Sequence, residues 1–461
     1  MSKKELAPTE DEGGVFFVLL AAPDASLEYT TRAAAGLSES LRHFPETKNV
    51  WQVLFVNNGF GGLQAVEWNK RSVTSQELQG RAFGAVAGIP GLQIIPVLPK
   101  PLPGAGNFDV ELVLTSAADP EQMAQIAEQL VGECFESGLF MYADTDLKID
   151  LPQSRINIDK QKVADLGLDL ASVGRDLSVL LSGNYVNRFN YDGRSYKVIP
   201  QIEGPARTNP EQILQLKIRA GDGGLVSISS FVTLETISAP RSLNRFQQRN
   251  SVKIQGVVRP GVTKGEALDW VEARARELMP PGYAADFAGE SRQLRTEGSS
   301  LAVTLGFALG LIYLVLAAQF ASFRDPLIVL LGSVPLAISG ALVFTFINLT
   351  TINIYSQVGL ITLVGLVAKN GILIVEFANK LQEMGLTKFG AVREAAITRL
   401  RPILMTSAAT AFGHFPLVLV TGPGAEARNS IGIVLVSGMV VSTIFTLFFV
   451  PSVYLLIARE H

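Results

Sequence analysis

Five long apolar segments in the last third of the chain constrain its fold more than any other feature. A helix needs about 20 mostly apolar residues to cross a hydrocarbon core of about 30 Å. The segments, joined by short connections, cover residues 299–320, 326–347, 353–379, 402–421 and 431–458. A soluble protein seldom buries five such helices in succession, so the sequence predicts an all-α transmembrane bundle of five helices over residues 298–461.

Basic residues in the short connections indicate how this bundle is oriented. One side of it carries seven of them, namely Arg324, Lys380, Lys388, Arg393, Arg399, Arg401 and Arg459. The other side carries only Arg428. Because short cytoplasmic loops are enriched in Lys and Arg, we expect the first side to face the cytoplasm. The region before residue 298 then lies outside the cytoplasm.

The first residues, MSKKELAPTEDEGG, contain lysines but no apolar stretch behind them. They therefore do not resemble a secretory signal. Export of the region before residue 298 needs an apolar segment upstream, so we expect the chain to be a fragment or one product of a split gene.

The region before the apolar segments has the alternating patterns of an α+β protein. Strand-like and helix-like stretches follow one another at residues 15–21, 27–44, 50–56, 75–86 and 92–98, and a second round begins at 108–114. Such βαβ-rich units predict small ferredoxin-like sandwiches with helices on one sheet face. We expect two subdomains and an insertion, over residues 1–110, over 111–160 with 241–297, and over 161–240.

The insertion contains a signal for a β-hairpin. Asp192 and Gly193 lie between two strand-like stretches, 185–189 and 195–202. An Asp-Gly pair between strands favours a two-residue turn. The sequence therefore predicts an exposed hairpin in the insertion.

Several classes of protein are excluded by missing signatures. No GxxxxGK[ST] motif occurs, no GxGxxG follows a strand, and HExxH and GxSxG are absent. Three histidines share no metal-ligand spacing, and the single Cys134 cannot form a disulfide within the chain. A net charge of −3 gives no basic surface for nucleic acid. We expect no enzyme, no metal and no cofactor, and a pump would draw on an ion gradient.

Lys369 is the most informative residue, because it lies near the middle of the third apolar segment. A cation at the bilayer centre costs about 2.5–3.5 kcal/mol on insertion scales, so it normally faces a bundle interior and has a partner. Glu376, the acid on the same segment, lies about 10 Å away along the helix axis. The other segments contain no acid. We therefore expect the counter-charge from outside this chain and favour a proton or ion relay over snorkelling or a static ion pair.

The fourth apolar segment adds polar residues with more than one interpretation. Arg399 and Thr406 are seven residues apart and share a helix face. Arg399 fits either a proton exit path or an anchor on the cytoplasmic side, and Thr406 fits either a relay or a bond to its own backbone. His414 fits packing better than a relay. Just before this segment, residues 385–398 predict an amphipathic helix at the cytoplasmic interface.

Two long motifs, GLITLVGLVAKNGILIVEFA at 359–378 and RLRPILMTS at 399–407, resemble the RND (resistance-nodulation-division) efflux permeases, hydrophobe/amphiphile (AcrB-like) branch. Shorter matches follow the same order along nearly the whole chain: LAPTED at 6–11, NGFG at 58–61, GNYVN at 183–187, QVGL at 357–360, GPGA at 422–425 and RNSIG at 428–432. The chain is similar to the C-terminal half of such a permease.

The resemblance implies a homotrimeric, multi-pass drug/proton antiporter in the inner membrane of Gram-negative bacteria. It would work with a periplasmic adaptor protein and an outer-membrane channel. This chain would supply two periplasmic porter subdomains, a docking insertion and the last five of twelve spans. The family's paired aspartates lie on a span of the other half, so this chain alone should not pump.

The resemblance also implies roles for individual residues. Lys369, Arg399 and Thr406 match the family's proton relay by motif position, with Asn370 beside the lysine. The hairpin residues Asn184, Tyr185, Val186 and Asn187 match the docking insertion.

The implied drug pocket departs from the family pattern. Phe60 and Phe108 match pocket phenylalanines, but Gly62 and Val110 stand two positions further on. We therefore expect a less aromatic pocket, because stacking surface is reduced. The glycine-rich residues 59–66, which include Gly61 and Leu63, are expected to form a flexible switch loop between two pockets.

A second hypothesis from a different class stays open. The chain fits a membrane-anchored interaction or export-accessory module without its own translocation pathway. Access of water to Lys369 and Thr406 distinguishes this module from a transporter. The identity and breadth of the substrates do not follow from the sequence.

Overall fold

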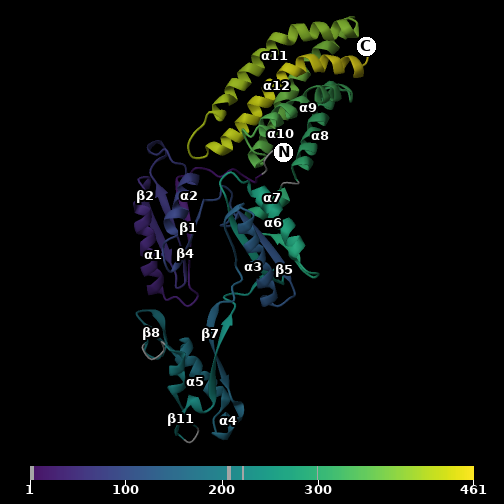
Figure 1. Ribbon diagram of the computed structural model, residues 1–461. Coiled ribbons are helices and arrows are strands. Elements are labelled where there is room, and N and C mark those ends of the chain that lie inside the picture. Colours follow the sequence, from purple (N-terminus) through teal and green to yellow (C-terminus); the bar gives the residue numbers. More distant parts are fainter. Residues whose placement is uncertain (1–4, 205–208, 221–222, 298–299, 461) are drawn as a thin grey trace. The chain divides into compact units, whose positions relative to one another are not determined.

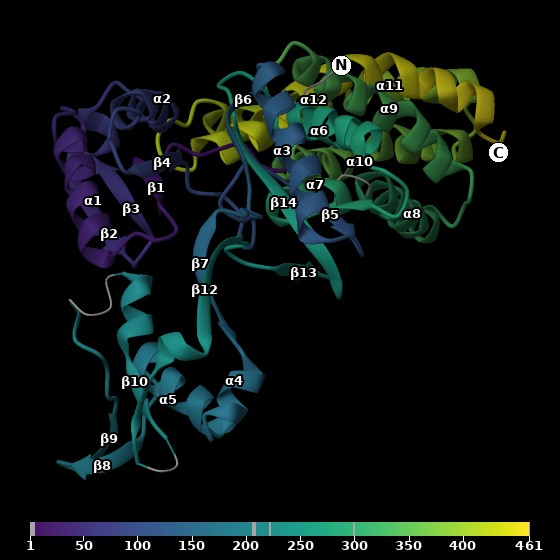
Figure 2. The ribbon, with the colours of Figure 1, turned by 60° about the horizontal axis from the view of Figure 1, so that its bottom comes forward.

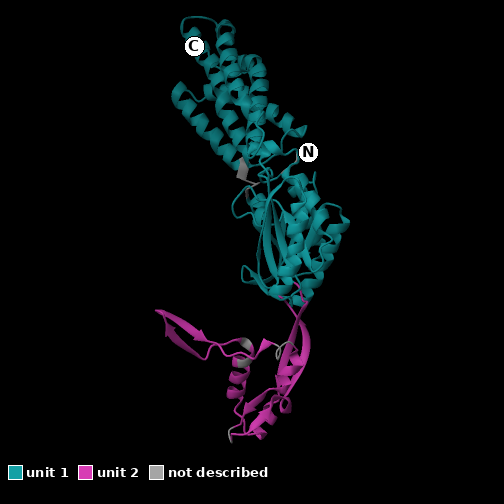
Figure 3. Ribbon diagram, turned by 90° about the vertical axis from the view of Figure 1, so that its left-hand side faces the viewer, with its two compact units in different colours: residues 1–147, 242–461 teal, residues 148–241 magenta. Residues whose placement is uncertain are grey.

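The computed structural model describes residues 5–204, 209–220, 223–297 and 300–460 (Figure 1). An α+β region precedes a region of apolar helices, which confirms the predicted order of the two classes. The chain divides into two compact units, Met1–Leu147 with Ser242–His461, and Lys148–Arg241 (Figure 3). The first unit contains two sheets and the apolar helices.

The first sheet has helices on one face. Its strands are antiparallel and lie in the order β2 (Thr47–Leu54), β3 (Asn58–Ala65), β1 (Gly14–Ala21) and β4 (Leu92–Val97). Side chains alternate between the two faces along β1, as expected for a strand. Phe17 and Leu19 join the core with Leu37 of α1 (Leu27–Arg42) and Leu78 of α2 (Ser75–Val86). Phe16 points to the opposite face and is exposed.

Local sequence fixes where α2 begins. The Thr74 hydroxyl accepts a hydrogen bond from the Glu77 N–H, and the Glu77 carboxylate accepts one from the Thr74 N–H. This reciprocal capping box satisfies two backbone donors that a helix start leaves free. The helix therefore starts at Ser75, as the sequence pattern predicts.

The second sheet repeats the element order of the first. Its elements follow as β5 (Val110–Ser116), α3 (Pro120–Glu136), β6 (Phe140–Thr145), β14 (Arg249–Val258), α6 (Lys264–Leu278) and β15 (Ala284–Phe287). Strand β14 pairs with β6 on one side and with β5 on the other, and β5 also pairs with β15. The short β13 (Asn244–Phe246) pairs with the beginning of β14, and α7 (Gly289–Glu297) follows β15. The strand order in each sheet is thus second, third, first, fourth.

Five helices follow, namely α8 (Ser300–Phe320), α9 (Asp325–Phe346), α10 (Ile354–Glu383), α11 (Lys388–Val418) and α12 (Ala425–Ile457). Within the described part of the chain, α8, α9, α10 and α12 are long and apolar enough to cross a membrane. Small residues allow α9 and α12 to approach closely. A Cβ atom at Gly332 would lie 2.7 Å from Val450, and one at Gly340 would lie 2.5 Å from Val441. Close approach of this kind is typical of helices packed in lipid.

Helix α11 differs from the sequence expectation. One continuous helix replaces the predicted amphipathic helix at 385–398 and the separate apolar helix at 402–421. Pro402 lies inside it, where a proline removes one backbone hydrogen bond and crowds the carbonyl of residue 398, at a cost of about 3 kcal/mol. Val392, Ala395 and Ile403, on both sides of that proline, belong to the same buried cluster. A single helix keeps all three residues in contact with the core. This shared packing explains why α11 is not divided into the two helices expected at 385–398 and 402–421.

The second unit contains the predicted hairpin. Strands β7 (Leu151–Ile158) and β12 (Val232–Ala239) run side by side as an antiparallel ribbon (Figure 2). Strands β8 (Asn187–Tyr191) and β9 (Arg194–Val198) pair around Asp192 and Gly193, which both have positive φ angles. Two positive φ angles are typical of a type I′ turn, so the hairpin prediction is confirmed. The unit also contains α4 (Lys160–Asp165), α5 (Leu170–Ser182), β10 (Lys217–Arg219) and β11 (Leu225–Ser227).

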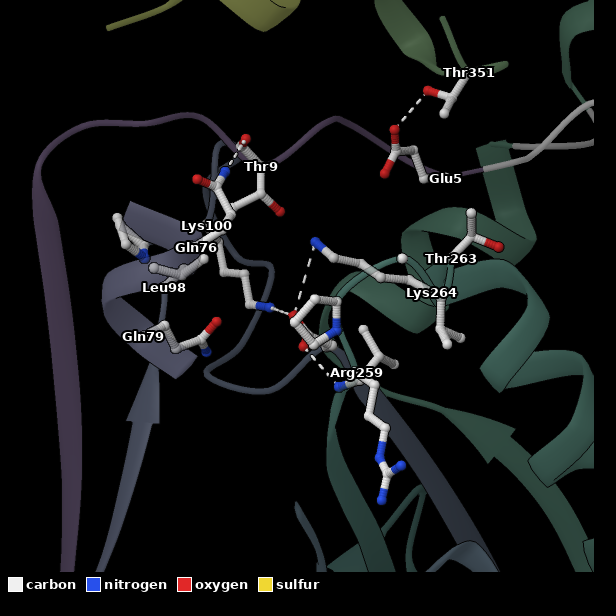
Figure 4. A pocket seen from close by; sticks show the side chains of 16 residues that line it. Glu5, Thr9, Gln76, Gln79, Leu98, Lys100, Arg259, Thr263, Lys264 and Thr351 are labelled. Atoms are coloured by element: carbon white, nitrogen blue, oxygen red, sulfur yellow. Dashed lines mark hydrogen bonds and ion pairs between the residues drawn. The ribbon is translucent and has the colours of Figure 1, made fainter. Parts of the chain in front are cut away.

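Four charged side chains form an ion cluster at the second sheet. Lys264 donates hydrogen bonds to both carboxylate oxygens of Glu290, at 2.8 and 2.9 Å. Lys100 lies 2.5 Å from Asp109, and Lys264 lies 3.9 Å from the same carboxylate. Lys100, Asp109 and Lys264 border a cavity of about 350 Å³, which Gln79 also lines (Figure 4). The cluster connects the segment between the two sheets to α6 and α7.

Opposite charges outweigh desolvation in this cluster. Burial by itself raises the pKa of Asp109, but the ammonium groups of Lys100 and Lys264 lower that pKa overall. Burial by itself lowers the pKa of Lys264, but Glu290 and Asp109 raise it overall. The cluster therefore stabilises the fold between acidic and strongly basic pH. Its contribution decreases as pH falls through the lowered pKa of Asp109.

The variant Lys264→Met is expected to destabilise the chain, because it leaves the buried Glu290 carboxylate with only the more distant Lys100 ammonium group, at 3.5 Å. Removal of one member of a buried pair costs about 3–5 kcal/mol. We expect a loss of about 3 kcal/mol or more in the free energy of unfolding, measured by denaturation of the purified chain in detergent. The double variant Lys264→Met/Glu290→Leu should recover most of this loss, because it removes both charges.

The matched control is Lys70→Met. Lys70 pairs with Glu67 on the surface, where both side chains are more than half exposed. Such a pair contributes about 0–1 kcal/mol, so the control should remain close to the unaltered chain. Equal unfolding free energies for Lys264→Met and Lys70→Met would contradict the role assigned to the cluster.

Candidate functional site

Lys369 contacts a hydroxyl group on the neighbouring helix. It lies on α10, and its Nζ donates a hydrogen bond to Thr410 Oγ1 of α11 at 3.2 Å. The next residue, Asn370, is 1% exposed and donates from Nδ2 to Ser407 Oγ at 3.1 Å. Successive residues of α10 thus bind hydroxyls one turn apart on α11.

In the residues that the structure describes, no carboxylate lies within ion-pair distance of Lys369. Glu376, the acid on the same helix, pairs with Lys380 at 2.9 Å. The Oδ1 atom of Asn370 is buried and has no hydrogen-bond partner among the described residues. A buried polar atom without a partner is unusual in a native protein. The polar contact between α10 and α11 therefore has an unused acceptor and an unneutralised ammonium group.

Thr406 does not contact Lys369. Thr406 is an exposed residue whose hydroxyl donates to the Ile403 carbonyl of its own helix at 3.2 Å, which is the backbone alternative considered from the sequence. Thr410, one helical turn further on, takes the place next to the lysine. The sequence interpretation missed Thr410, although its spacing of four from Thr406 places both on one helix face.

Arg399 and His414 flank this contact along the chain. The Arg399 guanidinium carbon lies 4.6 Å from the centre of the Phe377 ring, and Arg399 Nε is buried without a partner in the described part of the chain. Phe377 is eight residues beyond Lys369, which is about 12 Å along the helix. His414 Nδ1 lies 2.8 Å from the Thr410 carbonyl oxygen. Arg399 therefore lies at a different level from Lys369, while His414 adjoins the lysine's partner.

A second candidate site is an aromatic surface on the first sheet, on the face opposite α1 and α2. Phe16, Trp51, Phe55 and Phe60 are all exposed there, each by more than a third. The Trp51 ring centre lies 6.0 Å from that of Phe16 and 5.9 Å from that of Phe60. Phe60 in turn lies 6.2 Å from Phe55. These four side chains, the aromatic face, form one continuous surface for stacking.

The residues expected to form a flexible switch loop form strand β3 instead. Asn58–Ala65 pairs with β1 on one side and with β2 on the other. Gly62 lies opposite both Phe16 and Trp51, and a Cβ atom there would lie 2.7 Å from Trp51 Nε1. Glycine at this position lets the two aromatic rings meet above the strand. Leu63 is buried in the core.

Phe108 and Val110 lie in the interior. Phe108 stacks on Tyr142 with ring centres 5.8 Å apart, and Val110 is 1% exposed in β5. The Phe108 cluster also contacts Val18, which pairs with Phe60 across the sheet. Of the two predicted pocket phenylalanines, Phe60 therefore presents a surface and Phe108 supports it from the adjoining core.

The residues predicted for docking are exposed in the second unit. Tyr185 lies beneath two cations, with Arg188 at 5.0 Å and Lys197 at 5.1 Å from its ring centre. Asn184 and Asn187 bind neighbouring backbone N–H groups, and Val186 N–H donates to the Val198 carbonyl. The hairpin thus displays aromatic and basic groups together.

Known proteins match this chain along nearly its whole length. The profile of the AcrB/AcrD/AcrF family matches residues 3–458. An uncharacterized transporter of Haemophilus influenzae is 39% identical, over 99% of this chain and 45% of that protein. The multidrug/solvent efflux pump membrane transporter MepB of Pseudomonas putida is 32% identical, over 96% and 43%.

The multidrug export protein AcrF of Escherichia coli is 31% identical, over 98% of this chain and 45% of AcrF. The chain spans less than half the length of these relatives. The motifs around Lys369 and Thr406 lie inside the matched region. The chain belongs to the AcrB/AcrD/AcrF family of RND efflux permeases.

Proposed function

We propose that the chain is the C-terminal half of a proton-driven permease that exports drugs or other amphiphilic compounds. The observation that carries this proposal is Lys369, an intramembrane ammonium group held by a hydroxyl and by no carboxylate of the described residues. Relatives named for multidrug and solvent efflux support the substrate class. The permease is a secondary transporter and not an enzyme.

The charge of Lys369 couples proton uptake to a change in helix contacts. A carboxylate of the other half attracts the ammonium group when it is ionised and releases it when it is protonated. Each proton taken up therefore changes the contact between that half and α10. Arg399, about two helical turns from Lys369, and Thr406 belong to the same proton relay. Asn370 adds a hydrogen-bond acceptor, its Oδ1 atom, which has no partner among the described residues.

The membrane arrangement in this proposal has five spans, with α11 as the fourth. Within the described chain α11 is not among the helices that are long and apolar enough to cross a membrane. Most of its charged residues lie in its first half, and we assign the crossing to its second half, residues 402–418. The basic connections face the cytoplasm, so the two sheets are periplasmic. The protein lies in the inner membrane.

The periplasmic subdomains are ferredoxin-like in this proposal. The repeated order of strand, helix, strand, strand, helix and strand in the two sheets supports this interpretation. We assign residues 1–110 to one porter subdomain, residues 111–160 with 241–297 to the other, and residues 161–240 to a docking insertion.

Substrates bind at the aromatic face. Its rings offer stacking surface to flat, apolar molecules, and Phe60 lies next to Trp51. The permease assembles as a homotrimer with a periplasmic adaptor and an outer-membrane channel. The basic and aromatic hairpin at Tyr185 supports a docking role for the insertion.

The variant Lys369→Met is expected to reduce substrate export to the background of cells without the permease, because no charge remains for the carboxylate to attract. Dye efflux from cells with a complete permease containing this chain measures the effect. Lys380→Met is the matched control on the same helix. Its exposed pair with Glu376 contributes about 0–1 kcal/mol, so export should be retained. Normal export by Lys369→Met would instead favour the accessory module.

Loss of stacking surface should weaken export of planar aromatic dyes. Phe60→Ala and Trp51→Ala each remove contacts worth about 0.5–1.5 kcal/mol, so we expect an increase of about 2- to 13-fold in the half-saturating dye concentration. Phe135→Ala, an exposed phenylalanine on α3, is the control and should leave this concentration unchanged. If all three variants behave alike, the aromatic face is not the binding surface.

A further inference from the structure

We infer that one face of α11 binds anionic phospholipid headgroups of the cytoplasmic leaflet. This face, the basic stripe, lies on the first half of the helix and consists of Phe389, Arg393, Ile397, Leu400 and Arg401. The inference uses the proposed orientation of the bundle, but it does not depend on the proton relay. It gives a lipid partner to a surface that the proposed function leaves unassigned.

Helical spacing brings the residues of the basic stripe together. They follow one another at intervals of three or four, which places them on one side of an α-helix. The other side of the same half is buried, at Ala391, Val392 and Ala395. Phe389 is 63% exposed and Ile397 is 57% exposed. The basic stripe therefore faces away from the helices that the structure describes.

The two arginines of the basic stripe are exposed and have no acidic partner in the described chain. No carboxylate of the described residues lies within ion-pair distance of Arg393 or Arg401, and both residues are exposed. Residues 388–401 contain four basic side chains and one acidic side chain. That acid, Glu394, accepts a hydrogen bond from Thr398 at 3.5 Å. An anion that pairs with the two arginines must therefore come from outside the described residues.

A contact of Arg399 indicates the depth of the basic stripe. Its guanidinium carbon lies 4.6 Å from the centre of the Phe377 ring, inside the apolar segment 353–379. Arg401 is two residues further along α11, at the edge of the apolar layer, and Arg393 lies about 12 Å further out along the axis. A long arginine side chain in such a place extends toward the headgroups.

The exposed apolar side chains favour lipid over a protein partner on this face. Leu404 follows Ile397 by seven residues, and Phe415 follows Leu404 by eleven, so the same face continues into the half assigned to the crossing. Leu404 is 46% exposed and Phe415 is 44% exposed. Helices that pack against each other in a membrane use small residues at the contact. Large side chains along this whole face instead match acyl chains.

An anionic phospholipid supplies what Arg393 and Arg401 lack. A guanidinium group binds phosphate through two parallel hydrogen bonds. A basic side chain near the anionic cytoplasmic leaflet changes a binding constant about fivefold. The apolar members of the basic stripe enter the boundary between headgroups and acyl chains, as in other amphipathic helices. Bound headgroups therefore anchor the first half of α11 at the membrane surface.

The test places a fluorophore at Ile397→Cys, in the middle of the basic stripe. The native Cys134 is buried, and the complete permease that contains this chain is used without other accessible cysteines. Quenching by brominated phosphatidylglycerol is compared with quenching by brominated phosphatidylcholine. We expect a preference of about fivefold or more for phosphatidylglycerol at low salt. At about 1 M salt, where the Debye length is about 3 Å, this preference should decrease.

Variants of the arginines link the preference to the basic stripe. Arg393→Gln/Arg401→Gln should bring the preference close to onefold, whereas Arg393→Lys/Arg401→Lys should keep most of it, because the charge remains. Lys380→Gln is the matched control on the same side of the bundle. Lys380 is already paired with Glu376 at 2.9 Å, so its removal should leave the preference unchanged. The single glutamine variants replace the double variant should it not accumulate in the membrane, and each should lose part of the preference.

Three results overturn the inference. Equal quenching by the two lipids shows no headgroup preference, and a preference that survives Arg393→Gln/Arg401→Gln does not come from these arginines. Absence of quenching by either lipid shows that the other half of the permease covers the face.

The proposed function is tested separately. Loss of the phosphatidylglycerol preference leaves the effect of Lys369→Met on export unchanged, and normal export by Lys369→Met leaves the lipid site standing. A polar thiol reagent that reaches Ile397→Cys only from the periplasmic side overturns the proposed orientation, and the lipid site with it.

Discussion

The contact between α10 and α11 depends on the cost of placing an ammonium group among apolar helices. Lipid offers no hydrogen-bond acceptor, so the protein must supply one. In the described chain a threonine hydroxyl does so, which solvates Lys369 without neutralising it. Ala368 and Ile403 belong to one apolar cluster, and Val367 and Ala411 belong to another. The two polar bonds therefore lie between apolar layers, where an unpaired group is most costly.

Hydropathy and periodicity predict much of the fold, because both report burial directly. Alternation along β1 and the capping box at Thr74 act within a few residues, so the sequence pattern locates these elements well. Strand β3 could not be predicted, because three glycines in a short stretch are typical of a loop. Trp51 of the neighbouring strand covers Gly62, and a contact between two strands is not visible in the sequence of either one. Likewise, α11 continues through Pro402 because its two halves share one core.

The contact of Lys369 with α11 could likewise be predicted only in part from the sequence. A lysine in an apolar segment stands out in the sequence, so Lys369 could be found without a structure. Its partner could not, because the rotation and axial offset of α11 against α10 decide between Thr406 and Thr410. These residues lie one helical turn apart, and the sequence motif favoured the one whose hydroxyl bonds its own helix. Predicting the contact requires the packing of Ser407 against Asn370, which sets the offset.

The aromatic face shows why single positions are a poor guide to a stacking surface. Gly62 stands where the family pattern has an aromatic residue, which suggested a reduced stacking surface. Across the sheet, however, Gly62 pairs with both Phe16 and Trp51. The absence of a side chain on the central strand is what allows the two flanking rings to approach to 6.0 Å. Stacking surface lost from β3 is therefore supplied by β1 and β2. A comparison along β3 alone therefore finds fewer aromatic residues. The register of the three strands shows that aromatic side chains from β1 and β2 cover the same position.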